Sequence, residues 1–396
     1  MSNNIRIGTF TEGWFYWDGR NRHFTDCNWG YAIISAYASI FSGIRVFCRC
    51  RVANLDTFPS DEIIDLPNVT FTHLPPFHGL RSYLWHRSCV LKQVRDGLRD
   101  CDMCFVHIPG LVSSAGIKVA RSMGMPVICQ LIGDSHQVLR YDETLLPTKP
   151  LRMVASVFAL LKQRRETNQC QAQIAISKQL ARKFCDRPEA VPVIPDSRLM
   201  ESSFIPFRHR GRDEPFDALF VGRAVHHKNI QLFLHALAEL RRQGLPVKTT
   251  IVGDGNYLPV LQQLTNELEI GEHVRFVGRI YSRKGLLEYY RQAHALYLLS
   301  FTEGLGLVLM EAGAASLPII GSRRGGIPDL AHEGENAFLV EPNDVQGCVQ
   351  AVRRFVEDET LRERMGRRSQ EIMRPYTVKN VVASTAEVLR NVSNEK

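Results

Sequence analysis

A stretch near residue 300 carries residue types that could hold a phosphorylated ligand. The apolar run 295–299 predicts a buried strand ending at Ser300, the next loop holds Gly304 and Gly306, and a helix is expected to begin near Leu307. Glycines let a backbone approach a ligand closely, and a helix N-terminus presents unpaired N–H groups at the positive end of the helix dipole. The stretch predicts a loop that binds a diphosphate, although a loop that serves only packing can have the same sequence pattern.

Two glutamates and two cations accompany this loop. Glu303 lies before the helix and Glu311 about one turn inside it, where both could accept hydrogen bonds from hydroxyl groups on either side of a phosphate. Arg223 follows the apolar run 216–221, and Lys228 lies five residues later at the start of a helical pattern. Two cations at the carboxyl end of a strand suit a bound anion, and the alternative is a solvated charged loop.

The run from Phe220 to Asp344 resembles the donor-binding half of the family 4 retaining glycosyltransferases, also called glycosyl transferases group 1. Glu303 and Glu311 match the Glu-x7-Glu signature of that family, and Gly222, Arg223 and Lys228 match its Gly-Arg…Lys pattern. Four further motifs match in the order of the family, at residues 252–255, 276–278, 325–329 and 336–344. Three positions depart from the family pattern without removing a charge: Leu305, Asn229 and Asp329.

The resemblance implies a role for each matched residue. Arg223 and Lys228 would neutralise the donor diphosphate and the charge that grows on the leaving group. Glu303 would hold hydroxyls of the transferred sugar, and Glu311 those of the ribose. Backbone groups would contact the phosphates at Gly222, Gly304, Gly306, Leu307 and Val308, and the edge of the base at Gly278, Arg279 and Ile280.

The first half of the chain would recognise the acceptor, and the resemblance is weaker there. His107 is expected at the carboxyl end of a strand over 103–108, where the family often has a histidine that faces the acceptor; a buried structural histidine is the alternative. Asp134 and His136 follow the next strand, and one of them could help to take the acceptor proton, although the leaving phosphate of the donor can do this instead. Trp29 and Gly30 end a predicted long loop, 11–28. Aromatic residues of this loop could stack on sugars or fill a domain interface: Trp14, Phe15, Tyr16, Trp17 and Trp29.

Short apolar runs alternate with helical patterns along all 396 residues, which predicts an α/β protein of two Rossmann-like doubly wound domains, the GT-B fold implied by the resemblance. In the first half we expect strands over 5–10, 44–49, 103–108, 126–131, 172–176 and 191–194, and in the second over 216–221, 247–252, 273–276, 295–299, 318–321 and 337–340. We place an acceptor-side domain at 1–205 and a donor-binding domain at 213–373. The family's last helix packs back on its first domain, so residues 374–396 are assigned there.

The charge and the cysteine content limit the possible binding partners and the cellular compartment. The net charge is +8, and the whole excess lies in residues 1–210, which hold 26 Lys and Arg against 18 Asp and Glu. An apolar helix expected over 151–165 ends in cations; it is either a packed helix or a contact with an anionic membrane surface. Ten scattered cysteines, with no signal peptide and no membrane-spanning run, favour reduced thiols in a cytoplasmic protein. Such a protein could also contact the inner face of a membrane peripherally.

Taken together, the sequence predicts a glycosyltransferase that moves a sugar from a nucleoside diphosphate to an acceptor hydroxyl, with retention, in polysaccharide, glycolipid or related glycan biosynthesis. No cofactor is expected beyond a UDP-, GDP- or ADP-sugar donor. No metal is expected, because no Asp-x-Asp cluster lies near the donor loops. The basic half has no nucleic-acid motif, and Gly253-x-Gly255 lacks the third glycine of a dinucleotide site. The alternatives are a non-catalytic nucleotide-sugar-binding protein and another GT-B enzyme, such as a nucleotide-sugar epimerase.

Overall fold

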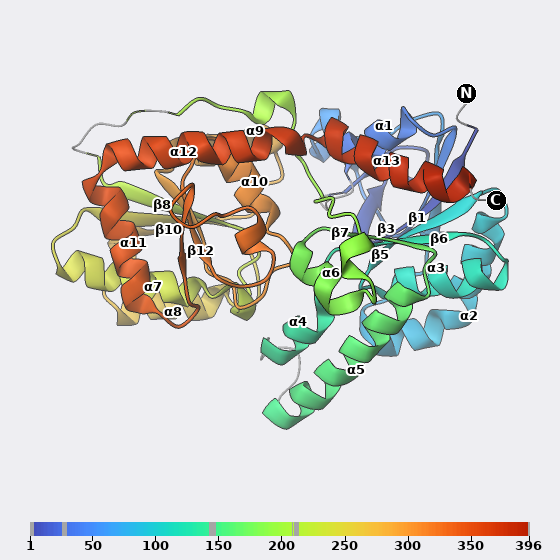
Figure 1. The fold of residues 1–396 in the computed structure, drawn as a ribbon, viewed down its shortest axis with the longest axis horizontal. Helices are drawn as coiled ribbons and strands as arrows, with labels where there is room; N and C mark the ends of the chain where they lie inside the picture. Colours follow the sequence, from blue (N-terminus) through green and yellow to red (C-terminus); the bar gives the residue numbers. More distant parts are fainter. Residues whose placement is uncertain (1–3, 26–29, 142–147, 208, 210–213, 395–396) are drawn as a thin grey trace. The chain divides into compact units, whose positions relative to one another are not determined.

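The computed structural model describes residues 4–25, 30–141, 148–207, 209 and 214–394 (Figure 1). The chain forms two compact units, and each has its own parallel sheet. Unit 1 comprises residues 1–133, 159–198 and 378–396, and unit 2 comprises residues 134–158 and 199–377. The sequence had assigned residues 134–158 to the first domain, whereas the structure groups them with unit 2.

The sheet of unit 1 has the strand order β4-β3-β1-β5-β6-β7, and all of these neighbours are parallel. The short β2 pairs antiparallel with the end of β1. Its strands are β1 (Arg6–Trp17), β2 (His23–Phe24), β3 (Gly43–Val52), β4 (Val69–Leu74), β5 (Met103–Ile108), β6 (Val127–Leu131) and β7 (Ala172–Ala175). Every residue of β5 and β6 is buried, as expected for central parallel strands covered on both faces.

Helices cover both faces of this sheet. They are α1 (Tyr31–Ala38), α2 (Gly79–Leu98), α3 (Leu111–Ser122), α6 (Lys178–Phe184) and α13 (Val378–Asn394). The C-terminal α13 contacts α1 and β7, so the last segment of the chain completes the first unit (Figure 1). Helix α5 (Lys149–Asn168) begins in unit 2 and ends in unit 1.

The sheet of unit 2 has the order β10-β9-β8-β11-β12-β13 and is parallel throughout. Its strands are β8 (Phe216–Val221), β9 (Val247–Val252), β10 (Val274–Gly278), β11 (Ala295–Leu298), β12 (Ile319–Ser322) and β13 (Ala337–Val340). Without β2, the two sheets share the order 3-2-1-4-5-6 of a doubly wound Rossmann fold. The direction of winding changes between β1 and β5 in unit 1 and between β8 and β11 in unit 2.

The helices of unit 2 follow the strands in alternation. They are α4 (Ser135–Tyr141), α7 (Ile230–Arg242), α8 (Leu258–Glu267), α9 (Arg283–Gln292), α10 (Leu307–Ala314), α11 (Val345–Glu357) and α12 (Glu359–Met373). Helix α7 buries Leu232, Phe233 and Leu237 against the sheet, and the Phe233 ring stacks on Tyr297 of β11 at 3.9 Å between centroids. In the described part of the chain, no helix combines the length and apolar composition needed to cross a bilayer.

The fold confirms the α/β prediction and corrects part of the first half. Residues 14–17 are a strand and not a loop: after a bulge, β1 resumes pairing with β3 from Trp14 to Trp17. The Phe15 ring is buried near Phe71 and the Trp17 ring contacts His73, so these side chains pack within unit 1. The expected strand at 191–194 is reduced to one bridge between Ala175 and Val193. The sequence did not predict β4, α2 or α12.

Candidate functional site

The sequence-predicted donor residues lie at the carboxyl edge of the unit 2 sheet, where the winding reverses. Gly222, Arg223 and Lys228 follow β8, and the 300–308 loop follows the neighbouring β11. In an open α/β sheet the two loops diverge at such a point and leave a crevice, which is where ligands bind. The short helix His226–Lys228 (η5) and the loop are joined directly, because the Phe301 N–H donates to the His227 carbonyl at 2.9 Å.

Lys228 and Glu303 form an ion pair across this point. Each side chain is only 15% exposed. Glu303 also accepts a hydrogen bond of 3.3 Å from the Ser300 hydroxyl. Because an ammonium group has three donors, Lys228 can hold Glu303 and still donate to a second anion. The structure thus joins the cation of one motif to the carboxylate of the other.

Glycines allow the backbone to pack closely around Glu303. Gly325 has φ +63°, and a Cβ there would lie 2.1 Å from the Glu303 carbonyl oxygen. The next residue, Gly326, donates its N–H to the same oxygen at 3.0 Å. The Gly-Gly turn after β12 therefore braces the Glu303 main chain.

A second glycine contact joins the loops after β8, β9 and β10. A Cβ on Gly253 would lie 1.8 Å from the Gly222 carbonyl oxygen, and one on Gly255 would lie 2.2 Å from the Ala224 oxygen. The Gly253 N–H donates to the Gly278 carbonyl at 2.8 Å. The three strand ends are thus held together main chain to main chain.

The side chain of Asn229 has a structural role at its position. Its φ of 55° and ψ of 40° are left-handed, a conformation that asparagine tolerates better than most residues. Its buried amide donates to the carbonyls of Leu299 and Pro342 at 3.0 and 2.8 Å. Asn229 therefore fixes η5 to the end of β11, a role that glycine at this position could not perform.

The N-terminus of α10 follows Glu303 closely in the sequence. Gly306 caps the helix with φ +91°, and no side chain caps its first N–H groups. Leu307 and Val308 form its first turn, and Leu307 lies three residues after Gly304 of the loop. Glu311 is one turn further on and accepts a hydrogen bond of 2.7 Å from the buried Tyr290 hydroxyl. A helix start with uncapped N–H groups suits an anion.

The remaining predicted donor residues are more exposed. The guanidinium of Arg223 is exposed and makes no hydrogen bond or ion pair with any described residue. Gly278 ends β10 with φ +80°, and Arg279 and Ile280 follow it in a loop in which Arg279 lies 4.9 Å from the Tyr281 ring. These loops leave β8, β10 and β11 at the same sheet edge.

In unit 1, His107 lies inside β5 and is 2% exposed. Its Nδ1 donates to the Phe10 carbonyl at 2.7 Å. Burial lowers the His107 pKa to about 4, against the hydrogen bonds to Phe10 and Gln130 that raise it. The ring is neutral at pH 7.

Gln130 connects His107 to a carboxyl group that sequence reasoning missed. The Gln130 amide donates to Asp196 Oδ1 at 3.0 Å. Burial raises the Asp196 pKa to about 6, although the Gln130 hydrogen bond and the Arg198 charge oppose this. No motif indicated Asp196, although it lies two residues past the expected strand 191–194.

Glu12 is a second missed residue, at the winding reversal of the unit 1 sheet. Its Oε1 accepts from the N–H groups of Val112 and Ser113 at 2.7 and 3.1 Å, and so caps α3. A Cβ on Gly110 would lie 2.1 Å from this oxygen, so a larger residue at the α3 N-cap would displace the Glu12 carboxylate. Burial raises the Glu12 pKa despite these hydrogen bonds and the nearby Arg49 charge. The only sequence signal was a carboxylate two residues after a buried strand.

The other predicted acceptor residues are spread between the units. Asp134 is buried and caps α4 by accepting from the Gln137 N–H at 3.0 Å, and His136 lies in the first turn of that helix. In unit 2, α4 packs on η5, and His226 Nδ1 lies 2.9 Å from the Tyr141 carbonyl oxygen. Gly30 is the N-cap of α1 in unit 1, and Trp29 lies outside the described residues.

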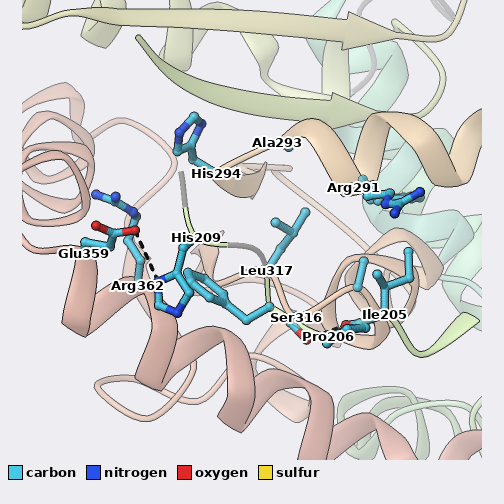
Figure 2. Close-up of a pocket in the computed structure, with 13 residues that line it drawn as sticks. Ile205, Pro206, His209, Arg291, Ala293, His294, Ser316, Leu317, Glu359 and Arg362 are labelled. Atoms are coloured by element: carbon cyan, nitrogen blue, oxygen red, sulfur yellow. Dashed lines mark hydrogen bonds and ion pairs between the residues drawn. The ribbon is translucent and has the colours of Figure 1, made fainter. Parts of the chain in front are cut away.

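A cavity of about 390 Å³ lies at the opposite edge of the unit 2 sheet (Figure 2). His294 on its wall directly precedes β11, and Leu317 lies two residues before β12, so the cavity opens at the amino-terminal strand ends. Figure 2 shows His209 beside Glu359 in it, 3.6 Å apart. The cavity is distinct from the donor residues at the carboxyl edge.

Comparison with known proteins identifies the second unit. The family model described as Glycosyl transferases group 1 matches residues 201–372. The chain carries a glycosyl transferases group 1 domain. That domain holds the predicted donor residues after β8, β10 and β11, and its limits agree with most of unit 2.

The relatives with curated functions match over the same half of the chain. N-acetyl-alpha-D-glucosaminyl L-malate synthase of Bacillus anthracis is 31% identical over 174 residues, 43% of this chain and 45% of the relative. Glycogen synthase of Mycobacterium tuberculosis is 31% identical over 180 residues, 45% of this chain and 43% of the relative. The match thus spans less than half of these relatives.

Solved structures match over nearly the whole chain. HepE of Anabaena, in complex with UDP and glucose, has a TM-score of 0.71 at 18% identity, covering 98% of this chain and all of that chain. Sucrose-phosphate synthase of Thermosynechococcus elongatus has a TM-score of 0.74 at 17% identity, covering 99% and 100%. The chain therefore has the GT-B fold, as the sequence predicted.

Proposed function

We propose that this protein is a glycosyltransferase that moves a sugar from a nucleoside diphosphate to an acceptor hydroxyl, in polysaccharide, glycolipid or related glycan synthesis. The Lys228–Glu303 ion pair carries the proposal. It joins the two charged motifs at the winding reversal of the group 1 domain, next in sequence to the uncapped α10 start. This arrangement has one group for phosphate and one for sugar hydroxyls.

The donor would be bound by groups that already surround this point. Lys228, Arg223 and the first N–H groups of α10 supply positive charge for the diphosphate and for the charge that develops when it leaves. Glu303 and Glu311 accept hydrogen bonds from hydroxyls of the sugar and the ribose. Gly278, Arg279 and Ile280 border the base.

Two finer assignments belong to the same proposal. We infer retention at the anomeric carbon from the Glu-x7-Glu resemblance. We also infer that no metal is needed, because the cations and the helix dipole provide the charge that a divalent ion would otherwise supply. On the acceptor side we assign His107, Asp134 and His136 to acceptor binding, and either Asp134, His136 or the leaving phosphate of the donor takes the acceptor proton.

The donor site is tested by thermal unfolding of the full chain with UDP, GDP or ADP, and with their common sugars, in EDTA. One nucleotide should raise the unfolding temperature, and Arg223→Ala and Glu311→Gln should remove this shift. Arg242→Ala is the matched control, since Arg242 is 74% exposed near the end of α7 and pairs with Glu239. Equal shifts in Arg223→Ala and the wild type would contradict the proposed site.

Catalysis is tested separately with the donor that binds. Donor consumption that depends on an added acceptor, together with an NMR assignment of the product anomer, distinguishes transfer from epimerisation. Donor consumption without any acceptor would favour an epimerase, and binding without consumption would favour a nucleotide-sugar-binding protein. A product of inverted configuration would refute retention.

We further propose that α5 contacts an anionic membrane surface. Its outer face exposes six apolar side chains at helical spacing, each 47–69% exposed: Leu151, Met153, Val154, Val157, Phe158 and Leu161. Basic residues flank this face, and the buried Arg152 and Ser156 lie on the other side. An apolar stripe bordered by cations is typical of helices that lie on anionic lipid.

The membrane proposal is tested by co-sedimentation with vesicles of neutral lipid or of neutral lipid with anionic lipid. Binding should require anionic lipid and should fall at least tenfold in Phe158→Ser with Leu161→Ser. Equal sedimentation of this variant and the wild type would refute it. The nine described cysteines form no disulfide, which agrees with a protein that works at the cytoplasmic face of such a membrane.

A further inference from the structure

A cluster of two histidines and two cysteines lies in unit 1, and none of the four is among the residues assigned to the donor. His23 is on β2, Cys50 on β3 and His73 on β4. Their nitrogen and sulfur atoms all lie within 4.8 Å of one another. Cys48, two residues before Cys50, places its Sγ 3.5 Å from that of Cys50.

The sheet register gathers these side chains on one face. Cys48 and Cys50 are two residues apart on β3, so both point to the same side. His73 pairs with Cys48 across the β3–β4 ladder and therefore shares that side. His23 is brought to the cluster by the β1–β2 pairing, in which it lies opposite Trp17.

The hydrogen bonds around His23 select the atom that would bind a metal. His23 Nδ1 lies 3.0 Å from the Asn21 carbonyl oxygen. A carbonyl only accepts, so Nδ1 carries the proton and Nε2 presents its lone pair to the cluster. Metal-bound histidines use this outer hydrogen bond to fix ring and tautomer.

Two of the separations are close to those of tetrahedral coordination. The Nε2 atoms of His23 and His73 lie 2.9 Å apart. Zinc bonds of about 2.0–2.1 Å to nitrogen and about 2.3 Å to sulfur place neighbouring ligand atoms roughly 3.3–3.8 Å apart. The nitrogens need to open by only a few tenths of an ångström, and the sulfurs are already near this spacing.

We propose that His23, Cys50 and His73, with Cys48 as the fourth ligand, bind one Zn²⁺ ion. Two imidazoles and two thiolates are a common donor set of structural zinc sites. A cavity of about 360 Å³ borders His23 and His73 and gives access. The ion would tie β2, which pairs only with β1 among the described strands, to β3 and β4.

The test uses the full chain without a histidine tag, freed of metal with EDTA and kept reduced. Zinc should bind at one ion per chain and raise the unfolding temperature of the metal-free protein by about 5 °C or more. Cobalt in place of zinc should give the absorption bands of tetrahedral thiolate coordination. It should also quench the fluorescence of Trp17, whose ring lies 4.4 Å from that of His73.

Variants separate the site from adventitious binding. Cys50→Ser and His73→Asn should weaken zinc binding by about 100-fold or more, while Cys89→Ser, which removes an exposed cysteine, should not change it. Cys48→Ser should lower the thiolate absorption of bound cobalt by about half. Far-UV circular dichroism of each metal-free variant shows that it is folded.

Three results would overturn the proposal. These are zinc binding no tighter in the wild type than in folded Cys50→Ser, a cobalt spectrum without thiolate bands, and a Cys48–Cys50 disulfide in the freshly isolated protein. An unchanged cobalt spectrum in Cys48→Ser would overturn the assignment of the fourth ligand. None of these outcomes depends on nucleotide binding or transferase activity.

Discussion

Replacing Asp196 by asparagine should stabilise unit 1 at neutral pH and not in acid. Burial raises the pKa of this carboxyl from 3.8 to about 6. A raised acid pKa means that the folded chain holds the proton more tightly than the unfolded chain. The stabilising contribution is therefore fully present below pH 3.8 and is lost as the pH rises to about 6.

The magnitude follows from the shift. Two pKa units correspond to about 3 kcal/mol, which is the free energy that ionised Asp196 costs the folded chain above pH 6. Asparagine stays neutral and can still accept the 3.0 Å hydrogen bond from Gln130. The variant should therefore exceed the wild type by up to about 3 kcal/mol at pH 8, and by roughly half of that at pH 5.

Urea unfolding followed by tryptophan fluorescence measures this difference. All four tryptophans lie in the first 85 residues, so the signal reports unit 1, where Asp196 lies. Groups with shifted pKa values that lie outside the His107–Gln130–Asp196 network are common to both proteins and cancel in the comparison. Asp186→Asn is the control, because that carboxyl is 70% exposed. A stability difference between Asp196→Asn and the wild type that stays constant from pH 5 to pH 8, or shrinks, would refute the reasoning.

Three further predictions concern the donor edge of unit 2. Lys228→Met and Glu303→Gln should each destabilise unit 2, because each change leaves one partly buried group without its partner. The double variant should recover about 1–3 kcal/mol of the summed loss in the free energy of unfolding, measured by far-UV circular dichroism in urea, and additive losses would contradict this. Gly325→Ala should lower the free energy of unfolding by about 2 kcal/mol or more and remove nucleotide binding, whereas Gly334→Ala, at φ +76° with nothing near its Cβ, should lower it by only about 1 kcal/mol. Equal losses in the two variants would show that the Glu303 contact is unimportant. Asn229→Gly keeps the left-handed backbone but leaves two buried carbonyls without their donor. The free energy of unfolding in urea should therefore fall by about 2 kcal/mol, and an unchanged value would argue against a structural role of the amide.

The second half of the fold could be read from the sequence because its strands are short apolar runs bounded by glycine. The ends of β8, β9 and β13 fall where the pattern placed them, and the motif loops follow those strands. Parallel strands end at a common edge, so motifs that follow β8 and β11 had to come together. The role of each donor residue stays a prediction.

The first half was harder to predict because its segments lack that pattern. The aromatic run at 14–17 was expected in a loop, where it would stack on sugars or fill a domain interface. These residues instead extend β1 past a bulge, and a bulge leaves no mark in the hydrophobic period. Helix α5 exposes its apolar face and buries Arg152, which reverses the usual pattern. Glu12 and Asp196 act through contacts with residues about 100 and 66 positions away, and local sequence does not encode such distances.

The main-chain contacts at Gly253, Gly255 and Gly325 limit how this protein can be altered. At an ordinary core position a larger residue can be accommodated when its neighbours are replaced by smaller ones. Here the opposing atoms are carbonyl groups, which every amino acid has, so no second substitution can create space. A library that aims to change donor preference should keep these three positions fixed and vary the accessible side chains at 279 and 280.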